Sequence, residues 1–246
     1  MGNPNYNGTE LILSSGANMV VVLFNYRVSV LGFLSSNGLG HDVDLNVGLL
    51  DQRQLLRWVQ KHISKVPASG SSAFPETAPG DPLPLFYWLP VIDGELIPDQ
   101  FHTLFATDQF AHVPVLVGHV TNEGSWFANN ASSTAEVSPF LRANYPHLKE
   151  SQLEEINHAY ANMAPLSGHA AFFPSASAAY GDATFACPTN YIASAVSRFP
   201  GAAKAWSYRY NVLDTEIVSG GYGVCHTLET SAVFGPGQAG WTASSY

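Results

Sequence analysis

The sequence predicts an α/β fold in which a mostly parallel sheet is flanked by helices. Asn18 to Tyr26 contains a continuous run of β-branched and aromatic residues, which is typical of a strand buried on both faces. Residues 27 to 45 hold three glycines and read as a loop. Asn46 then caps a predicted helix whose leucine, valine and isoleucine side chains fall on one stripe. A strand, a loop and an amphipathic helix in this order form part of an α/β unit.

Further strands and helices continue this pattern along the chain. Val113 to Val120 is a second candidate for a buried strand, and Ala205 to Val212 alternates aromatic residues as a third strand would. Helices are predicted at Ser138 to Tyr145 and at Lys149 to Tyr160, and Tyr191 to Arg198 reads as the end of another.

Length and composition indicate one soluble globular domain that spans residues 1–246. The chain has 246 residues, of which 46% are apolar and only 12% are charged. Its formal net charge is -9, which excludes nucleic acid as a partner because no basic patch could neutralise phosphates. No apolar run is long enough to span a bilayer.

One segment interrupts the α/β pattern. Residues 66–84 hold five prolines together with serines and glycines, so they cannot form a regular element. A structureless stretch of this length is unusual inside a compact domain. We therefore interpret residues 66–84 as an aberrant join within a single, partial domain.

The cysteines and the glycosylation motifs give mixed signals about the compartment. Cys187 and Cys225 are too few for a disulfide framework, and the sequence leaves open whether they pair with each other or whether either has lost a partner. Asn7-Gly8-Thr9 and Asn130-Ala131-Ser132 are N-glycosylation sequons. Met1 to Tyr6 lacks the features of a signal peptide, so we expect an extracellular location only if the true start lies upstream.

Four stretches of the chain carry a family resemblance. They are Val20–Arg27 with Gly32–Leu34; Gly48–Arg53 with Trp58–Gln60; Pro90–Gly94 through Val113–Gly118 to Asn122–Ser125; and Gly223–His226 through Glu229 to Val233–Gly235. In this order they resemble the type-B carboxylesterase/lipase family, which includes cholinesterases and many fungal secreted esterases. The resemblance covers most of the chain. It implies an α/β-hydrolase fold and hydrolysis of a small-molecule or lipid carboxylic ester, without a cofactor or a metal.

The resemblance also implies two site residues. The family's triad runs in the order serine, acid, histidine. By position, Glu123 matches the acid and His226 the base. Taken singly, a glutamate after a strand is more often a solvated surface group, and a lone histidine is more often an ordinary loop residue. Together they fit acyl transfer, in which the acid fixes the tautomer of the imidazole and stabilises the imidazolium.

The nucleophile of such a triad is not found in the sequence. It requires a G-x-S-x-G elbow, and Gly70-Ser71-Ser72-Ala73-Phe74, the nearest approach, lacks the final glycine. The family places its elbow directly after the helix that ends near Lys65, where the join begins. The glycine-rich oxyanion segment is expected before Asn3. We therefore expect the central strands of the sheet to be missing, its flanking strands to be exposed and the chain to be inactive.

Two alternative functions remain open at this point. The first is a non-catalytic, cholinesterase-like binding module. The second is a thiol hydrolase in which Cys225 acts beside His226, although a small apolar filler is the simpler reading of this cysteine. Asp182 matches a family position that we expect to support the histidine loop. Cys187 resembles a position that is disulfide-bonded in some family members.

Overall fold

The computed structural model describes residues 7–35, 43–62, 85, 89–199, 201 and 203–235. Its elements are α1 (Thr9–Ser14), α2 (Ser29–Phe33), α3 (Val47–His62), α4 (Phe101–Ala106), β1 (Val115–Val120), the 3₁₀ turn η3 (Glu123–Trp126), α5 (Thr134–Asn144), α6 (Glu150–Ala159), α7 (Phe173–Gly181), the π-turn η4 (Asp182–Ala186), α8 (Cys187–Arg198), β2 (Ala205–Tyr210), α9 (Thr215–Ser219) and α10 (Glu229–Phe234). The predicted join at 66–84 lies outside the described residues.

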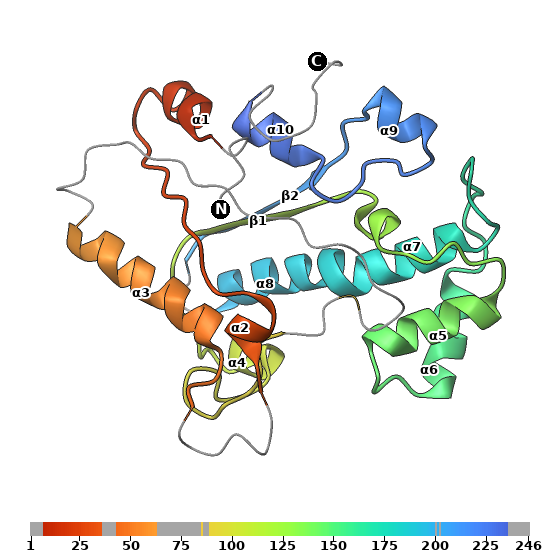
Figure 1. The fold of residues 1–246 in the computed structure, drawn as a ribbon, viewed down its shortest axis with the longest axis horizontal. Helices are drawn as coiled ribbons and strands as arrows, with labels where there is room; N and C mark the ends of the chain where they lie inside the picture. The colour runs from red at the N-terminus through yellow and green to blue at the C-terminus, as the bar shows by residue number, and fades with distance from the viewer. Residues whose placement is uncertain are drawn as a thin grey trace.

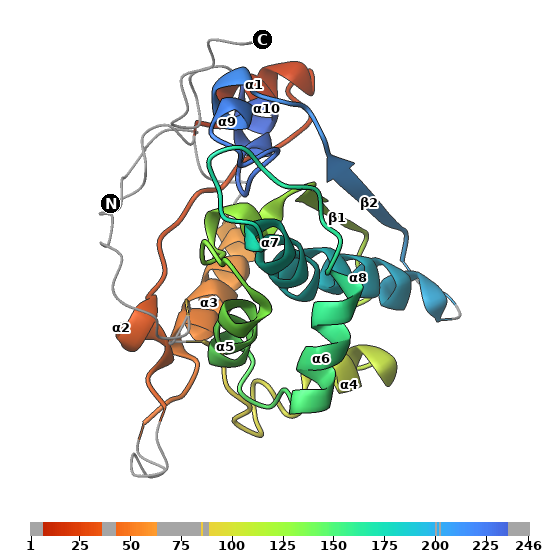
Figure 2. The same cartoon turned by 90° about the vertical axis from the view of Figure 1, so that its right-hand side faces the viewer.

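The described residues form one sheet, in which β1 and β2 run parallel (Figure 1). Val115 is in register with Ala205, and Val120 is in register with Tyr210. Helix α8 packs against both strands, whereas α1, α9 and α10 lie on the other side of the pair in both views (Figure 2). Two of the three predicted strands are thereby confirmed.

The predicted strand from Asn18 to Tyr26 is wrong for the described structure. This segment is non-regular and pairs with no strand among the described residues. Val20 is 70% exposed and Leu23 is 56% exposed. A strand of a parallel sheet forms only where neighbouring strands satisfy its backbone groups, and β1 and β2 bond to each other and not to this segment. Strand β1 is also not buried on both faces, because Leu116 is 68% exposed.

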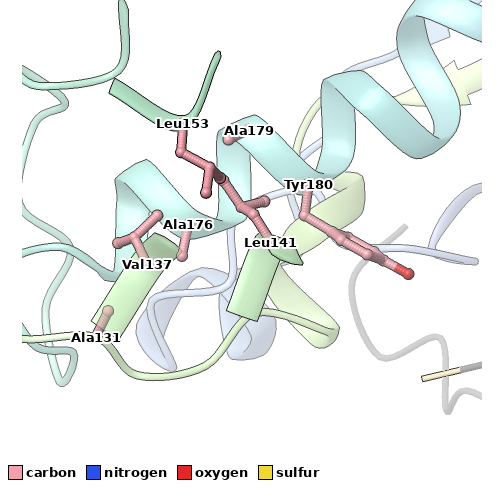
Figure 3. Packing of buried hydrophobic residues seen from close by; sticks show 7 residues of the cluster. All are labelled: Ala131, Val137, Leu141, Leu153, Ala176, Ala179 and Tyr180. Carbon is pink, nitrogen blue, oxygen red and sulfur yellow. The ribbon is translucent and has the colours of Figure 1, made fainter. Parts of the chain in front are cut away.

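The largest core lies among α5, α6 and α7, where the predicted helices at 138–145 and 149–160 are confirmed (Figure 3). Leu141 and Leu153 from the first two helices meet Ala176 and Tyr180 of α7, and all four are at most 2% exposed. The small side chains of α7 allow the other helices to approach closely. Burial of each of the two leucines stabilises the fold by about 1.5–3 kcal/mol.

Helix α3 confirms the predicted helix after Asn46, but Asn46 does not cap it with its side chain. The Asn46 carbonyl accepts the first helical hydrogen bond, from Leu50 at 3.1 Å. The side-chain amide instead donates to the Val91 carbonyl and to Asp93, both at 2.7 Å, and accepts from the Val91 N–H at 2.8 Å. Asn46 is 1% exposed and has a φ of 53°, a left-handed conformation that asparagine tolerates well. It therefore pins the segment around residue 91 to the start of α3.

A second contact ties the exposed segment before α2 to α3. The Arg27 guanidinium donates two hydrogen bonds to Asp51, at 2.8 and 2.6 Å, and the Arg27 N–H donates a third at 3.1 Å. The hydrogen bond from Arg27 lowers the pKa of Asp51 to about 2. Added Cβ atoms at Gly32 and Gly48 would lie 2.1 and 2.4 Å from the Arg27 carbonyl oxygen, so this crossing requires both glycines.

None of the described helices combines the length and the hydropathy that a membrane span requires.

We predict that Asn46→Ala lowers the free energy of unfolding by roughly 3 kcal/mol, because Val91 and Asp93 lose their hydrogen bonds to a buried side chain and alanine disfavours the left-handed backbone. Urea denaturation measures the change. Asn46→Gly, which tolerates this backbone, separates the two contributions. The exposed Gln60→Ala on α3 is the control, with an expected change within about 0.5 kcal/mol. If Asn46→Ala lowers the free energy of unfolding no more than Gln60→Ala does, Asn46 does not stabilise the contact between α3 and the segment around residue 91.

Candidate active site

Glu123 lies directly beyond the C-terminal end of β1, in the first position of η3. It is 6% exposed. One carboxylate oxygen, Oε1, accepts a hydrogen bond of 2.8 Å from the Val120 N–H, so the last residue of β1 orients the acid. A buried carboxylate needs such partners because burial without them is strongly unfavourable. The second oxygen, Oε2, remains to meet the histidine.

His226 is delivered by residues 221–226, which continue the sheet's parallel pairing beyond β2. The Asn122 N–H donates to the Val224 carbonyl at 2.9 Å, and the Val224 N–H donates to Asn122 Oδ1 at 2.9 Å. A parallel bridge joins Asn122 and Cys225. The histidine loop is thereby held beside the acid's turn, at the carboxyl ends of both strands.

The two side chains meet at this edge. His226 Nδ1 lies 2.5 Å from Glu123 Oε2. Since the carboxylate accepts, Nδ1 carries the proton and donates, which leaves Nε2 of a neutral imidazole as the basic nitrogen. The His226 side chain is 33% exposed and that of Glu123 is 7% exposed, so the acid is enclosed while the imidazole reaches the surface. This arrangement can accept a proton at Nε2 and stabilise the resulting imidazolium.

The two glycines near these residues are required for different reasons. Gly223 has a φ of 63°, and a Cβ there would lie 2.3 Å from Asn122 Oδ1. It therefore permits both the turn and the approach of the Asn122 amide. Gly124, by contrast, has no positive φ. A Cβ there would lie 1.9 Å from the Ser177 carbonyl oxygen, so Gly124 allows η3 to pack against α7.

Sequence reasoning missed two residues that hold the site together. Asn122 bonds the histidine loop through both its backbone and its side chain, as described above. The Ser125 hydroxyl lies 2.8 Å from the carbonyl oxygens of both Asn122 and Tyr222, and Ser125 is 2% exposed. The signal in the sequence was the run of polar residues that directly follows a strand in Thr121-Asn122-Glu123-Gly124-Ser125.

The predicted role of Asp182 is wrong. Its carboxylate accepts a hydrogen bond of 2.7 Å from the Tyr160 hydroxyl, at the end of α6. The hydrogen bonds that hold the histidine loop come instead from Asn122 and Ser125. The turn that begins at Asp182 does reach the histidine, but through the Phe185 ring.

Cys225 is not placed to act as a nucleophile. It is fully buried, and burial raises the pKa of its thiol to about 11, with the nearby carboxylates of Asp214 and Glu123 adding to the shift. The thiolate is the reactive form, and it is strongly disfavoured here. The apolar-filler reading is supported, since Cys225 packs with Val120, Val224 and Leu228. Cys187 is exposed and both cysteines are free, so they do not pair with each other.

Glu229, on α10, is a second partly buried carboxyl near the pair. Burial raises its pKa, and the charge of Glu123 adds to this effect. Its Oε2 atom is buried and has no hydrogen-bond partner among the described residues, and the same holds there for the hydroxyl of the buried Ser231 on the same helix. Glu229 is therefore an energetically unfavourable anion in the folded chain.

Other features of the described residues do not add to this site. No group of three or more His, Cys, Asp or Glu side chains is arranged to hold a metal ion in the described part of the chain. Two surface hollows lie beside α3. Arg27 and Arg53 are among the residues that line the first, and Asp93 and Arg53 are among those that line the second; neither is lined by Glu123 or His226. The nearest approach to an elbow, residues 70–74, lies outside the described residues.

The fold is similar to that of a known α/β hydrolase. The chain superposes on the crystal structure of Aspergillus niger EstA with a TM-score of 0.86 and 36% sequence identity, covering 99% of this chain and 63% of EstA. This likeness establishes an α/β-hydrolase fold and confirms the predicted fold class. The sequence profile of the Carboxylesterase family matches residues 1–67 and 71–242. The chain belongs to the carboxylesterase family.

Shorter stretches match individual relatives. A secreted lipase of Arthroderma benhamiae is 36% identical over 75 residues, which are 28% of this chain and 15% of the lipase. Human neuroligin-3 is 51% identical over 53 residues, or 22% of this chain and 6% of neuroligin-3. Acetylcholinesterase of Electrophorus electricus is 53% identical over 51 residues, or 21% of this chain and 8% of the enzyme. The matches thus cover a small part of each relative.

We predict that iodoacetamide labels Cys187 and not Cys225 in the native protein. The exposed Cys187 thiol reacts. The Cys225 thiol is buried, so the reagent does not reach it, and its raised pKa disfavours the reactive thiolate. Peptide mass spectrometry after labelling at pH 8, with and without denaturant, distinguishes the two sites. Equal labelling of both cysteines without denaturant would contradict the structure and reopen the thiol-hydrolase reading.

We predict that Glu229→Gln stabilises the chain at pH 8 and has little effect at pH 4. The pKa of Glu229 is raised in the folded state, so its contribution to stability is fully present below the unfolded pKa and is lost as pH rises through the folded pKa. Glutamine removes this loss. Thermal unfolding at both pH values is the measurement, with the exposed Glu155→Gln as control. An equal gain at both pH values, or a loss at pH 8, would contradict the prediction.

Proposed function

We propose that Glu123 and His226 are the acid and the base of a carboxylic-ester hydrolase site. The observation that carries the proposal is the 2.5 Å contact between His226 Nδ1 and Glu123 Oε2 at the carboxyl ends of two parallel strands. In an α/β hydrolase this edge is where the triad assembles. Membership in the carboxylesterase family supports the same reaction class.

The pair supplies half of the chemistry of acyl transfer. His226 Nε2 takes the proton of an attacking hydroxyl and later returns it to the leaving alcohol, while Glu123 keeps Nδ1 protonated and stabilises the imidazolium. A serine must supply the hydroxyl that attacks the ester carbonyl and forms the acyl-enzyme, which water then hydrolyses. The substrate is a small-molecule or lipid carboxylic ester.

We further propose that the chain as it stands does not turn over esters. In the family's order the serine precedes the acid, and the 246 residues contain no G-x-S-x-G motif. The family match is interrupted at 68–70, inside the segment that we interpret as a join. Removal of the nucleophile alone reduces turnover by several orders of magnitude in comparable enzymes.

The hydrolase reading accounts for more of the site than the binding-module reading. A binding module has no need for a buried glutamate that orients an imidazole, and here Val120, Asn122 and Ser125 all contribute to that geometry. The likeness to neuroligin-3 is confined to 53 residues and does not by itself favour binding.

We propose an extracellular location for the protein to which this chain belongs. One similar protein is named a secreted lipase. Both sequon asparagines, Asn7 and Asn130, are exposed in the structure, as glycosylated asparagines must be.

The net charge of -9 argues against a nucleic-acid partner.

We predict that the purified chain hydrolyses p-nitrophenyl butyrate no faster than a histidine-catalysed background. The difference in rate between the chain and its His226→Ala variant should therefore not exceed that background. Spectrophotometric release of p-nitrophenol, with and without a serine-directed organophosphate, is the measurement. Turnover that the organophosphate abolishes would show a working serine and overturn the proposed inactivity. Ser72→Ala would then be the first variant to test, and Ser151→Ala on the surface of α6 the matched control.

A further inference from the structure

A π-turn interrupts what is otherwise one long helix. Helix α7, η4 and α8 follow one another without a break, and Asp182, Ala186 and Cys187 all have helical backbone angles (Figure 1). A single π-turn inside an α-helix is rare, because its wider hydrogen bonding is less favourable, and it is found most often near functional sites.

The side chains of the π-turn reach three separate parts of the fold. Asp182 accepts the hydrogen bond from Tyr160 at the end of α6. The Thr184 hydroxyl hydrogen-bonds the Tyr145 hydroxyl, which follows α5. Phe185 contacts the His226 ring instead. The first two contacts anchor the turn on α5 and α6, so the position of Phe185 is fixed by its own helix and by two others.

The Phe185 ring forms an aromatic cluster with Phe127 and His226. Its centroid lies 4.9 Å from that of the His226 imidazole, at an interplanar angle of 42°. The Phe127 ring lies 5.1 Å from the imidazole and is stacked on Phe185 at 5.8 Å and 20°. The imidazole thus has the Glu123 carboxylate at Nδ1 and phenyl rings beside it.

The π-turn explains how one helix contacts both the acid's turn and the histidine. Ser177 and Gly181 of α7 face Gly124, whose absent Cβ would clash with the Ser177 carbonyl. In a regular α-helix each four-residue step drifts around the axis by roughly 40°, so a third residue on this line would turn away. The wider turn offsets this drift between Gly181 and Phe185. Ser177, Gly181 and Phe185 can therefore line one side of the site.

We propose that Phe185, presented by the π-turn, is a positioning residue for His226. The hydrogen bond to Glu123 fixes only one edge of the imidazole, and the ring can still swing about that contact. Phe185 and Phe127 restrict the swing, which directs Nε2 toward one place. They also exclude water from the Nδ1–Glu123 hydrogen bond, which is stronger in a drier environment. The inference rests on the proposed roles of Glu123 and His226.

The test compares Phe185→Leu with Phe140→Leu in the full chain. Both changes remove one phenyl ring from the aromatic cluster around Tyr180, but Phe140 is paired with Tyr180 and not with His226. Proton NMR on protein with ¹⁵N-labelled histidine measures how fast the His226 Nδ1 proton exchanges with water. Thermal unfolding measures the accompanying loss of stability.

We expect the Nδ1 proton to exchange about tenfold faster in Phe185→Leu, as the loss of one aromatic pair implies, and at the wild-type rate in Phe140→Leu. Both variants should unfold at a lower temperature. Phe185→Tyr, which retains the ring, should restore slow exchange. If Phe185→Leu does not fold, Phe185→Met makes the same comparison with an unbranched apolar side chain.

The outcomes separate this inference from the proposed function. If the Nδ1 proton exchanges slowly in the wild type and equally slowly in Phe185→Leu, Phe185 does not position His226. The Glu123–His226 hydrogen bond would then still stand. Equal acceleration in Phe185→Leu and Phe140→Leu would reduce Phe185 to a packing residue and also overturn it. A wild-type protein without a protected Nδ1 proton would contradict the Glu123–His226 hydrogen bond itself, and with it the proposed function.

Discussion

The parallel pairing of β1 with β2 and its continuation by Asn122 is the constraint on which the site depends. Parallel strands bring their carboxyl ends to one edge, so the residues that follow them can meet although more than 80 positions separate the strands in sequence. Asn122 extends this pairing by two hydrogen bonds to Val224. The distance between Glu123 and His226 follows from this register. A slip of one residue would turn the side chains to the opposite face.

Several large apolar side chains are exposed on the described part of the chain. Val20 and Leu23, in a segment typical of a buried strand, are more than half exposed, as are Leu116 on β1 and Trp206 on β2. Solvent-exposed apolar surface of this extent is unfavourable and favours association. The likeness to EstA covers 63% of that chain. Asn18 to Tyr26, which has the sequence of a buried strand, pairs with no strand among the described residues.

The sequence predicted local elements well where the local pattern alone decides the outcome. The amphipathic helix after Asn46 and the strands at Val115–Val120 and Ala205–Tyr210 are present because their own residues and one neighbour suffice. The strand at Asn18–Tyr26 fails because its stability comes from other strands, which no local pattern encodes. Helix α7 was missed because its alanines, serines and buried aromatics show no amphipathic period. Glu123 and His226 could be predicted as a pair only through motifs that resemble a family, whereas Asn122, Ser125 and Phe185 depend on tertiary contacts.

The described contacts that hold Glu123 beside His226 do not include a nucleophile. Every described contact that fixes them comes from residues between 115 and 226, namely β1, η3, the π-turn, and the loop that follows β2. This part of the fold has its own buried cluster, in which Val120, Val224, Cys225 and Leu228 pack together. Among the described residues, therefore, the contacts that hold the pair do not include any from the part of the chain before residue 115. Its presence is evidence of ancestry and of local stability, and catalysis requires a correctly placed hydroxyl in addition.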